Sequence, residues 1–176
     1  MSTRTTGAVY LLISAILVAF LGMLAWIVLA APGASQFENQ PEALIQPVVA
    51  LVGLTALVWC LMVLCRNLAV IRGKVSLRYF RSYASDAPAE WVERPARAYM
   101  NLLELPVLFY VACALMLATG KFDSVQVALA WAFVLVRCVH ALIHIGFNYV
   151  PLRFTAFSAG SIALGVLWVR FAAQNL

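Results

Sequence analysis

Charged residues are scarce in this 176-residue chain: they make up 11% of the sequence, whereas apolar residues make up 65% and the mean hydropathy is +0.95. A soluble globular domain is about one quarter charged and about half apolar. The composition therefore excludes an ordinary water-soluble domain and favours a membrane protein.

Acidic residues are the rarer charged type, with seven Asp and Glu against twelve Lys and Arg. The resulting charge of +5 would suggest a nucleic-acid partner in a soluble protein, but the chain has no basic arm or stripe. A surplus of Lys and Arg on the cytoplasmic side of membrane spans explains the charge more simply. We therefore expect the lipid bilayer, and no nucleic acid, as a partner.

Cysteine is also sparse, and all four cysteines lie within apolar runs, at Cys60, Cys65, Cys113 and Cys138. Such residues behave as small buried hydrophobes. Their placement indicates neither a disulfide framework nor a zinc cluster, and we predict no metal site from them.

Five long apolar runs are each long enough for the roughly 20 residues that a membrane-spanning helix needs. They are residues 7–31, 44–71, 96–120, 125–149 and 152–171. The first run exceeds the core of a secretion signal, which is about 7–15 residues, so we interpret it as a retained helix. We predict an all-α polytopic membrane protein, with one additional transmembrane helix and linker in residues 1–43 and a four-helix bundle in residues 44–176.

Basic residues gather on one side of this predicted topology. That side holds Arg4, Arg72, Lys74, Arg78, Arg81, Arg94 and Arg153, and the other side holds Lys121 and Arg170. We predict the basic side, with the N-terminus, to be cytoplasmic, in a bacterial inner membrane, because no targeting or retention signal is visible. The polar segment 72–94 mixes aromatic with basic residues and suits the headgroup layer, as a solvated loop or as a functional lid.

A polar stripe runs along the third predicted span. We expect this helix to begin at Arg94 and Pro95, with the proline in its favoured first turn. At 100° per residue, four polar residues fall within an arc of about 80°. They are Arg94, Arg97, Asn101 and Glu104.

A second stripe runs along the fourth predicted span, again within about 80°. It consists of Arg137, His140, His144 and Asn148. Counting along each helix at 1.5 Å per residue places Glu104 and His140 at a similar depth, roughly 14 Å. Because ionisable groups inside a membrane usually pair or line a cavity, the two stripes predict a polar pocket in the cytoplasmic half of the bilayer.

Two more residues lie close to this predicted pocket. Pro106 cannot donate to the carbonyl of Leu102, so the third helix should bend just past Glu104. Arg153 lies in the first turn of the last predicted span, where unpaired N–H groups and the helix dipole favour anions, although an interfacial snorkelling cation is the alternative.

The predicted pocket combines cations, one anion and neutral hydrogen-bonding groups. Its members are Arg97, Arg137, Arg153, Glu104, Asn101, His140 and His144. Guanidinium groups suit carboxylates and Glu104 suits an amine, so a zwitterionic ligand with more than one carboxylate would match this set. A cation beside a bound thiol would also favour the reactive thiolate.

The sequence at 94–106, Arg-Pro-Ala-Arg-Ala-Tyr-Met-Asn-Leu-Leu-Glu-Leu-Pro, resembles a family signature. The family is that of the membrane-associated proteins in eicosanoid and glutathione metabolism (MAPEG), whose signature runs Arg, Ala, two variable residues, Asn, two variable residues and an acid. Residues 73–78 resemble the end of the family's first helix, and residues 137–140 with 151–153 resemble its third helix and the turn into its fourth. The likeness covers about residues 47–171, so the helix predicted at 7–31 would be an addition.

The resemblance implies a homotrimer that binds glutathione, as a co-substrate, between neighbouring subunits near the cytoplasmic side. On the matching positions, the residues that would contact glutathione are Arg97, Asn101, Glu104, Arg137 and His140. Arg153 would match the arginine that stabilises or activates the glutathione thiolate. Family activities are conjugation of glutathione to lipophilic electrophiles, peroxide reduction, and isomerisation or synthesis of lipid mediators.

Four positions depart from the family pattern. Met100 and Ser76 stand where several members carry basic residues, Phe157 stands where eicosanoid-processing members carry a tyrosine, and Phe154 replaces a polar residue. These replacements argue against prostaglandin-type chemistry and leave catalysis open, whereas the ionic stripe supports binding.

Three hypotheses follow. The first is a glutathione-dependent membrane enzyme, a transferase or peroxidase acting on lipophilic small molecules that enter from the lipid. The second is a noncatalytic membrane subunit or structural partner that uses the polar stripes to associate helices. The third is a metal or haem site at His140 and His144, which lie four residues apart, but the lack of a clear third ligand and the nearby Arg137 disfavour it.

Overall fold

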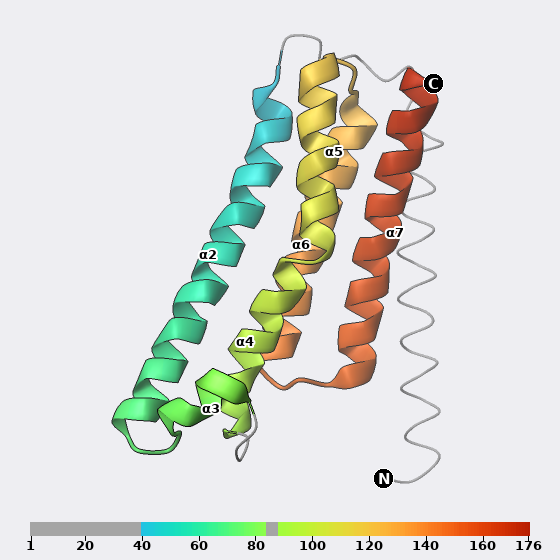
Figure 1. The fold of residues 1–176 in the computed structure, drawn as a ribbon. Coiled ribbons are helices and arrows are strands. Elements are labelled where there is room, and N and C mark those ends of the chain that lie inside the picture. Colours follow the sequence, from blue (N-terminus) through green and yellow to red (C-terminus); the bar gives the residue numbers. More distant parts are fainter. Residues whose placement is uncertain (1–39, 84–87) are drawn as a thin grey trace, which may run out of the picture.

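The computed structural model of the chain describes residues 40–83 and 88–176, with helices α2 to α7 (Figure 1). All regular elements in these ranges are helices, and four helical spans are long and apolar enough to cross a membrane. The prediction of an all-α polytopic membrane protein is therefore confirmed. The helix predicted at 7–31 lies outside the described residues, and the division between residues 43 and 44 stays a prediction.

The first described span is α2 (Glu42–Ile71), which begins close to the predicted residue 44 and ends at the predicted residue 71. The helix ends in a capped turn, where Gly73 adopts a positive φ of 64° and the Lys74 N–H donates to the carbonyl of Ala69 at 2.9 Å. Glycine is favoured there because it adopts this left-handed geometry without steric cost. The turn leads the chain away from the bundle.

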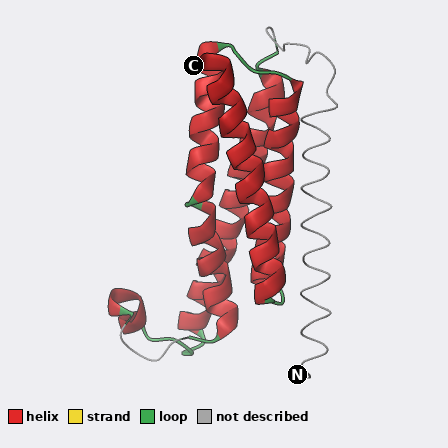
Figure 2. Ribbon diagram, turned by 90° about the vertical axis from the view of Figure 1, so that its right-hand side faces the viewer, coloured by secondary structure: helices red, strands yellow, loops and turns green. Residues whose placement is uncertain are grey.

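The polar segment after this turn contains a short helix, α3 (Leu77–Ser82). Figure 2 shows α3 at the lower left, set apart from the four long spans. This segment is therefore partly helical, rather than the simple loop that we weighed from the sequence, and it lies beside one end of the bundle.

The next helix, α4 (Glu90–Leu102), begins four residues before the start expected from the sequence. Glu90 and Glu93 lie in its first turn, where the positive end of the helix dipole favours acids. Glu90 also accepts hydrogen bonds from the Arg94 side chain, one turn later. Pro95 consequently lies in the second turn, so the expectation of a proline in the first turn of this helix is wrong.

The third span is broken where a bend was expected. Helix α4 ends at Leu102 and α5 (Leu105–Thr119) begins three residues later. Glu104 leaves helical geometry (φ −90°, ψ −99°) and becomes the N-cap residue of α5. Pro106 then occupies the first turn of α5, where its missing N–H costs no intrahelical bond. The proline thus starts a new helix instead of kinking an existing one.

The last two spans are α6 (Ser124–Ile145) and α7 (Val150–Asn175). Helix α6 ends four residues before the predicted residue 149, because Gly146 and Asn148 leave helical geometry and Asn148 adopts a positive φ of 49°. Asn148 therefore belongs to the loop between α6 and α7, and its placement on the stripe of α6 is wrong.

The N-terminus of α6 is fixed by a capping box. Asp123 accepts hydrogen bonds from the N–H groups of Val125 and Gln126, and the Gln126 side chain accepts one from the Asp123 N–H at 2.9 Å. The same carboxylate accepts hydrogen bonds from Arg170 (2.6 and 2.9 Å) and Gln174 (2.9 Å), near the end of α7. Burial raises the pKa of Asp123, but these hydrogen bonds outweigh burial and hold the pKa below its usual value.

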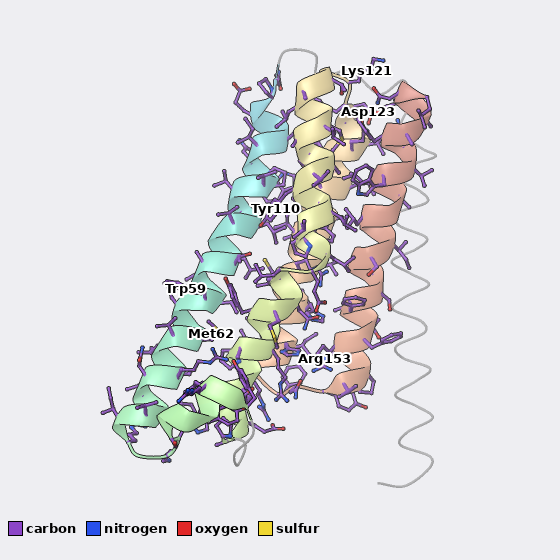
Figure 3. All side chains as sticks on the ribbon, viewed as in Figure 1. Trp59, Met62, Tyr110, Lys121, Asp123 and Arg153 are labelled. Atoms are coloured by element: carbon purple, nitrogen blue, oxygen red, sulfur yellow. The ribbon has the colours of Figure 1, made fainter. Side chains whose placement is uncertain are left out.

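The four spans alternate in direction and pack as a bundle, in which α6 contacts α2, α4 and α7 (Figures 1 and 2). Phe109 of α5 and Phe133 of α6 stack in the core, with ring centroids 4.9 Å apart. Large apolar side chains are exposed along the outside of every span, as a bilayer requires. Figure 3 shows Lys121 and Asp123 at one end of the bundle and Arg153 towards the opposite end, where α3 also lies.

Candidate functional site

A buried arginine with no hydrogen-bond partner among the described residues lies beside the candidate site. Arg137, on α6, is 0% exposed, and none of its three guanidinium nitrogens has a hydrogen-bond partner among the described residues. Its guanidinium carbon lies 5.3 Å from the ring centroids of both Phe133 and Phe157. The two rings cover the guanidinium by cation–π contact. Its N–H donors remain unused, and an unpaired cation inside a membrane bundle is costly unless something binds it.

Two histidines follow Arg137 on the same face of α6, at steps of three and four residues. His140 and His144 are 3% and 2% exposed, and their rings stack with centroids 5.8 Å apart. The His140 Nδ1 lies 3.1 Å from the carbonyl oxygen of Arg153, so we assign the proton to Nδ1 as the donor. The Nε2 of His140 is then a free acceptor, because it has no described partner.

Of these three residues, only His140 lines a pocket of about 310 Å³ between α4, α6 and α7. Arg137 contacts Phe157, which also lines the pocket. The pocket is lined by Asn101, Glu104, His140, Val150, Arg153, Phe154 and Phe157. The polar side chains come from both predicted stripes and from the start of α7, as the helical spacing suggested. The apolar side chains all come from α7, so the pocket has an ionic side and an aromatic side.

Glu104 reaches this pocket because of the helix break. Its side chain is exposed in the isolated chain, although it lies in the middle of the span Glu90–Thr119. The Glu104 carboxylate acts electrostatically on Arg137, but no ion pair joins them among the described residues. Asn101, one turn earlier, donates from Nδ2 to the carbonyl of Arg97 at 3.0 Å, which leaves its Oδ1 as an acceptor.

Arg94 and Arg97, the two arginines at the start of the α4 stripe, have different surroundings. Arg94 is used structurally: it pairs with Glu90 and donates to the carbonyl of Gly146 in the loop after α6. Arg97 is half-buried, and its Nε has no described partner. Three residues of the predicted pocket, Arg97, Arg137 and His144, do not line it.

Arg153 lies at the fourth position of α7 and lines the pocket. Its Nη1 donates to the Oδ1 of Asn148 at 2.8 Å, which fixes one end of the guanidinium fork. Arg153 therefore keeps further donors for a ligand. Asn148, although it is not on α6, still contributes to the site by holding this arginine.

Sequence reasoning missed the two rings that cover Arg137. Phe133 precedes Arg137 by four residues, so the helical spacing of an aromatic and a cation was a usable signal. Phe157 belongs to α7, and no local pattern indicates its contact with Arg137. It was noted only as a residue that departs from the family pattern.

The comparisons with known proteins give one positive result. The model of the MAPEG family matches residues 44–173 of this chain. Neither the search of curated proteins nor the search of solved structures returned a match.

Proposed function

Because the chain belongs to the MAPEG family, we propose that it is a glutathione-dependent membrane enzyme acting on lipophilic electrophiles. The coarse class, an integral membrane protein of the glutathione and eicosanoid metabolism type, follows from the family and the four spans. The finer assignment depends on one observation above all: the guanidinium of Arg137 is buried and has no hydrogen-bond partner within residues 40–83 and 88–176.

This observation favours a ligand over helix association. If the polar stripes served only to hold helices together, the buried cation would be expected to pair with a carboxylate or a carbonyl within the bundle. Arg137 has no such partner in the described part of the chain, and His140 keeps a free acceptor beside it. A carboxylate of glutathione fits the unused guanidinium donors, because Arg and carboxylate groups bind in a two-pronged fork.

The remaining pocket residues suit the other ends of the same tripeptide. Glu104 and the Oδ1 of Asn101 are acceptors for its ammonium group. Arg153, held by Asn148, lies on the opposite wall, and a guanidinium beside the cysteine thiol lowers the pKa of that thiol. We propose that the thiol loses its proton to solvent there and that the thiolate attacks an electrophilic carbon. The carbon–sulfur bond forms as a leaving group departs with its bonding electrons. Phe154 and Phe157 provide an apolar wall for the electrophile.

We further propose that the active form is a homotrimer whose pocket is completed by a neighbouring subunit. Glu104 supports this proposal, since an exposed carboxylate in the middle of a membrane span is unfavourable against acyl chains. A second copy, together with bound glutathione, would cover it. The pocket end of the bundle, with its surplus of basic residues, is proposed to face the cytoplasm across a bacterial inner membrane.

A glutathione titration of the detergent-purified protein, followed by conjugation assays with a general electrophile, tests this function. We expect saturable binding of both glutathione and S-methylglutathione to the wild type. Arg153→Leu should keep most of the affinity for S-methylglutathione, which has no thiol to ionise, but should lose turnover. Lys121→Gln, an exposed cation at the other end, is the control and should change neither. Absence of saturable binding by the wild type would refute the proposal.

A second candidate, a noncatalytic glutathione-binding subunit, is favoured by the aromatic wall of α7. Phe154 and Phe157 offer no hydroxyl that could polarise a substrate. Saturable glutathione binding with no thiol consumption across a panel of electrophiles and peroxides would support this candidate over the enzyme.

A further inference from the structure

The turn and short helix after α2 carry exposed basic side chains beside exposed apolar ones. Arg72, Lys74 and Arg81, here named the basic corner, are all exposed. Ile71 and Tyr83, at the two ends of this segment, are 79% and 60% exposed. A water-facing loop gains nothing from such apolar exposure, whereas at a membrane surface the apolar side chains enter the acyl boundary and the cations meet the headgroups.

Two side-chain contacts join α3 to the ends of α2 and α4. The guanidinium carbon of Arg66 lies 5.2 Å from the ring centroid of Phe80, and the Tyr79 hydroxyl donates to Glu93 at 3.3 Å. Tyr79 is buried and packs edge-on against Phe80 and Tyr83, with ring centroids 5.3 Å apart in both pairs. Burial and the Glu93 carboxylate raise the pKa of Tyr79, whose hydroxyl would be protonated at neutral pH even without this shift. Arg81 is thus presented from a helix that contacts two spans, and Arg72 and Lys74 come from the turn before this helix.

The acids closest along the chain among the described residues do not neutralise the basic corner. Glu90 pairs with Arg94, and Glu93 accepts the hydrogen bond from Tyr79. The ion pairs found within residues 40–83 and 88–176 do not include Arg72, Lys74 or Arg81. Three positive charges therefore lie together at the end of the bundle without an acidic partner among these residues.

We propose that the basic corner binds the headgroups of anionic phospholipids in the leaflet at the pocket end of the bundle. Because these charges have no acidic partner in the described part of the chain, they select a headgroup with a net negative charge over a zwitterionic one. The exposed Ile71 and Tyr83 favour a lipid over a soluble anion, because only a lipid offers them an apolar phase. Each basic residue near an anionic surface strengthens binding about five-fold, so three together give roughly 100-fold. The proposal is independent of whether the pocket binds glutathione.

Lipid binding to the full-length protein in detergent tests this proposal. Phosphatidylglycerol and phosphatidylcholine with the same acyl chains are titrated, and the readouts are the thermal unfolding midpoint and the lipid retained in native mass spectrometry. We expect the wild type to retain phosphatidylglycerol preferentially. The triple variant R72Q/K74Q/R81Q should need about 100-fold more phosphatidylglycerol for the same retention. Equal retention of the two lipids by the wild type overturns the proposal.

A matched pair of single variants guards against misfolding of the triple variant. Arg81→Gln and Lys121→Gln each remove one exposed positive charge, the first in the basic corner and the second at the opposite end. We expect an about five-fold loss of phosphatidylglycerol binding for Arg81→Gln only. Equal losses in both variants would show that the effect is one of total charge. Stabilisation by inorganic phosphate that equals that by phosphatidylglycerol would point to a free anion, and it overturns the lipid assignment.

Discussion

Replacing Arg137 with methionine is the sharpest test of the site. The guanidinium is fully buried, lies between two phenylalanine rings and has no described hydrogen-bond partner. Methionine keeps much of the length and the apolar contact area but removes the charge and all five donors. A hydrogen bond to a charged group contributes about 1.5–3 kcal/mol, and a guanidinium fork makes two with one carboxylate. The loss is therefore at least about 3 kcal/mol, which is a roughly 150-fold weaker affinity for glutathione.

The same substitution should leave the stability of the ligand-free protein intact. Removing one member of a buried ion pair costs about 3–5 kcal/mol because the other charge is stranded. Arg137 has no described ion-pair partner to strand. Burying the charged guanidinium of Arg137 destabilises the folded protein by several kcal/mol. The two cation–π contacts stabilise it by about 2 kcal/mol each. These two contributions nearly cancel, so the unfolding midpoint without glutathione should stay unchanged or rise.

Titration calorimetry and thermal unfolding, each with and without glutathione, measure the two effects separately. The matched control is Arg170→Met, the same chemical change at an arginine that does pair, with Asp123. We expect Arg170→Met to lower the unfolding midpoint and to leave the affinity for glutathione unchanged. The two variants should therefore show opposite patterns.

Two outcomes would refute this reasoning. Wild-type affinity for glutathione in Arg137→Met would mean that the buried cation does not contact the ligand. A loss of several kcal/mol of stability in the ligand-free variant would mean that Arg137 has a structural partner, as the helix-association hypothesis requires.

Three further predictions concern Glu104, Asp123 and Pro106. Glu104→Gln should weaken glutathione binding by about 1.5–3 kcal/mol, which is about 10-fold to 150-fold. Binding of N-acetylated glutathione should not change, because its amine carries no charge. Calorimetry with both ligands checks this. The lowered pKa of Asp123 stabilises the folded state above the unfolded pKa of about 3.9, and this stabilisation is lost as the pH falls through the lower folded pKa. Asp123→Asn should therefore lower the unfolding midpoint at neutral pH and flatten its decline in acid, in thermal unfolding across a pH series. Pro106→Ala restores an N–H that can donate to the carbonyl of Leu102, so the α4 helix should extend through the break. The unfolding midpoint should then rise, and glutathione binding should weaken because Glu104 moves. Thermal unfolding and glutathione titration measure the two effects.

The spans and the facing polar side chains could be predicted from the sequence because both depend on simple periodicities. A run of about 20 apolar residues has few alternatives to a membrane helix. Spacings of three and four residues place Arg137, His140 and His144 on one face of any regular helix. Equal depth along antiparallel helices then brings Glu104 and His140 to one pocket, and both do line it.

The ends of the helices could not be predicted, because side-chain contacts across several residues determine them. The pairing of Glu90 with Arg94 helps α4 to start earlier than the proline suggested, and the left-handed Asn148 follows the early end of α6. The contact between Arg137 and Phe157 joins two helices, so it depends on packing that no local pattern records. The ligand roles of the pocket residues stay predictions until binding is measured.

The break between α4 and α5 divides the third span into two helical segments joined by a hinge. Its two segments share α2 as a neighbour but differ in the other: α4 also lies against α6, whereas α5 lies against α7. When the bilayer thickens or thins, spans respond by tilting. Because Leu103 and Glu104 lie outside both helices, we expect α5 to tilt at this break more readily than α4, which would shield the geometry around Asn101 from changes in membrane thickness.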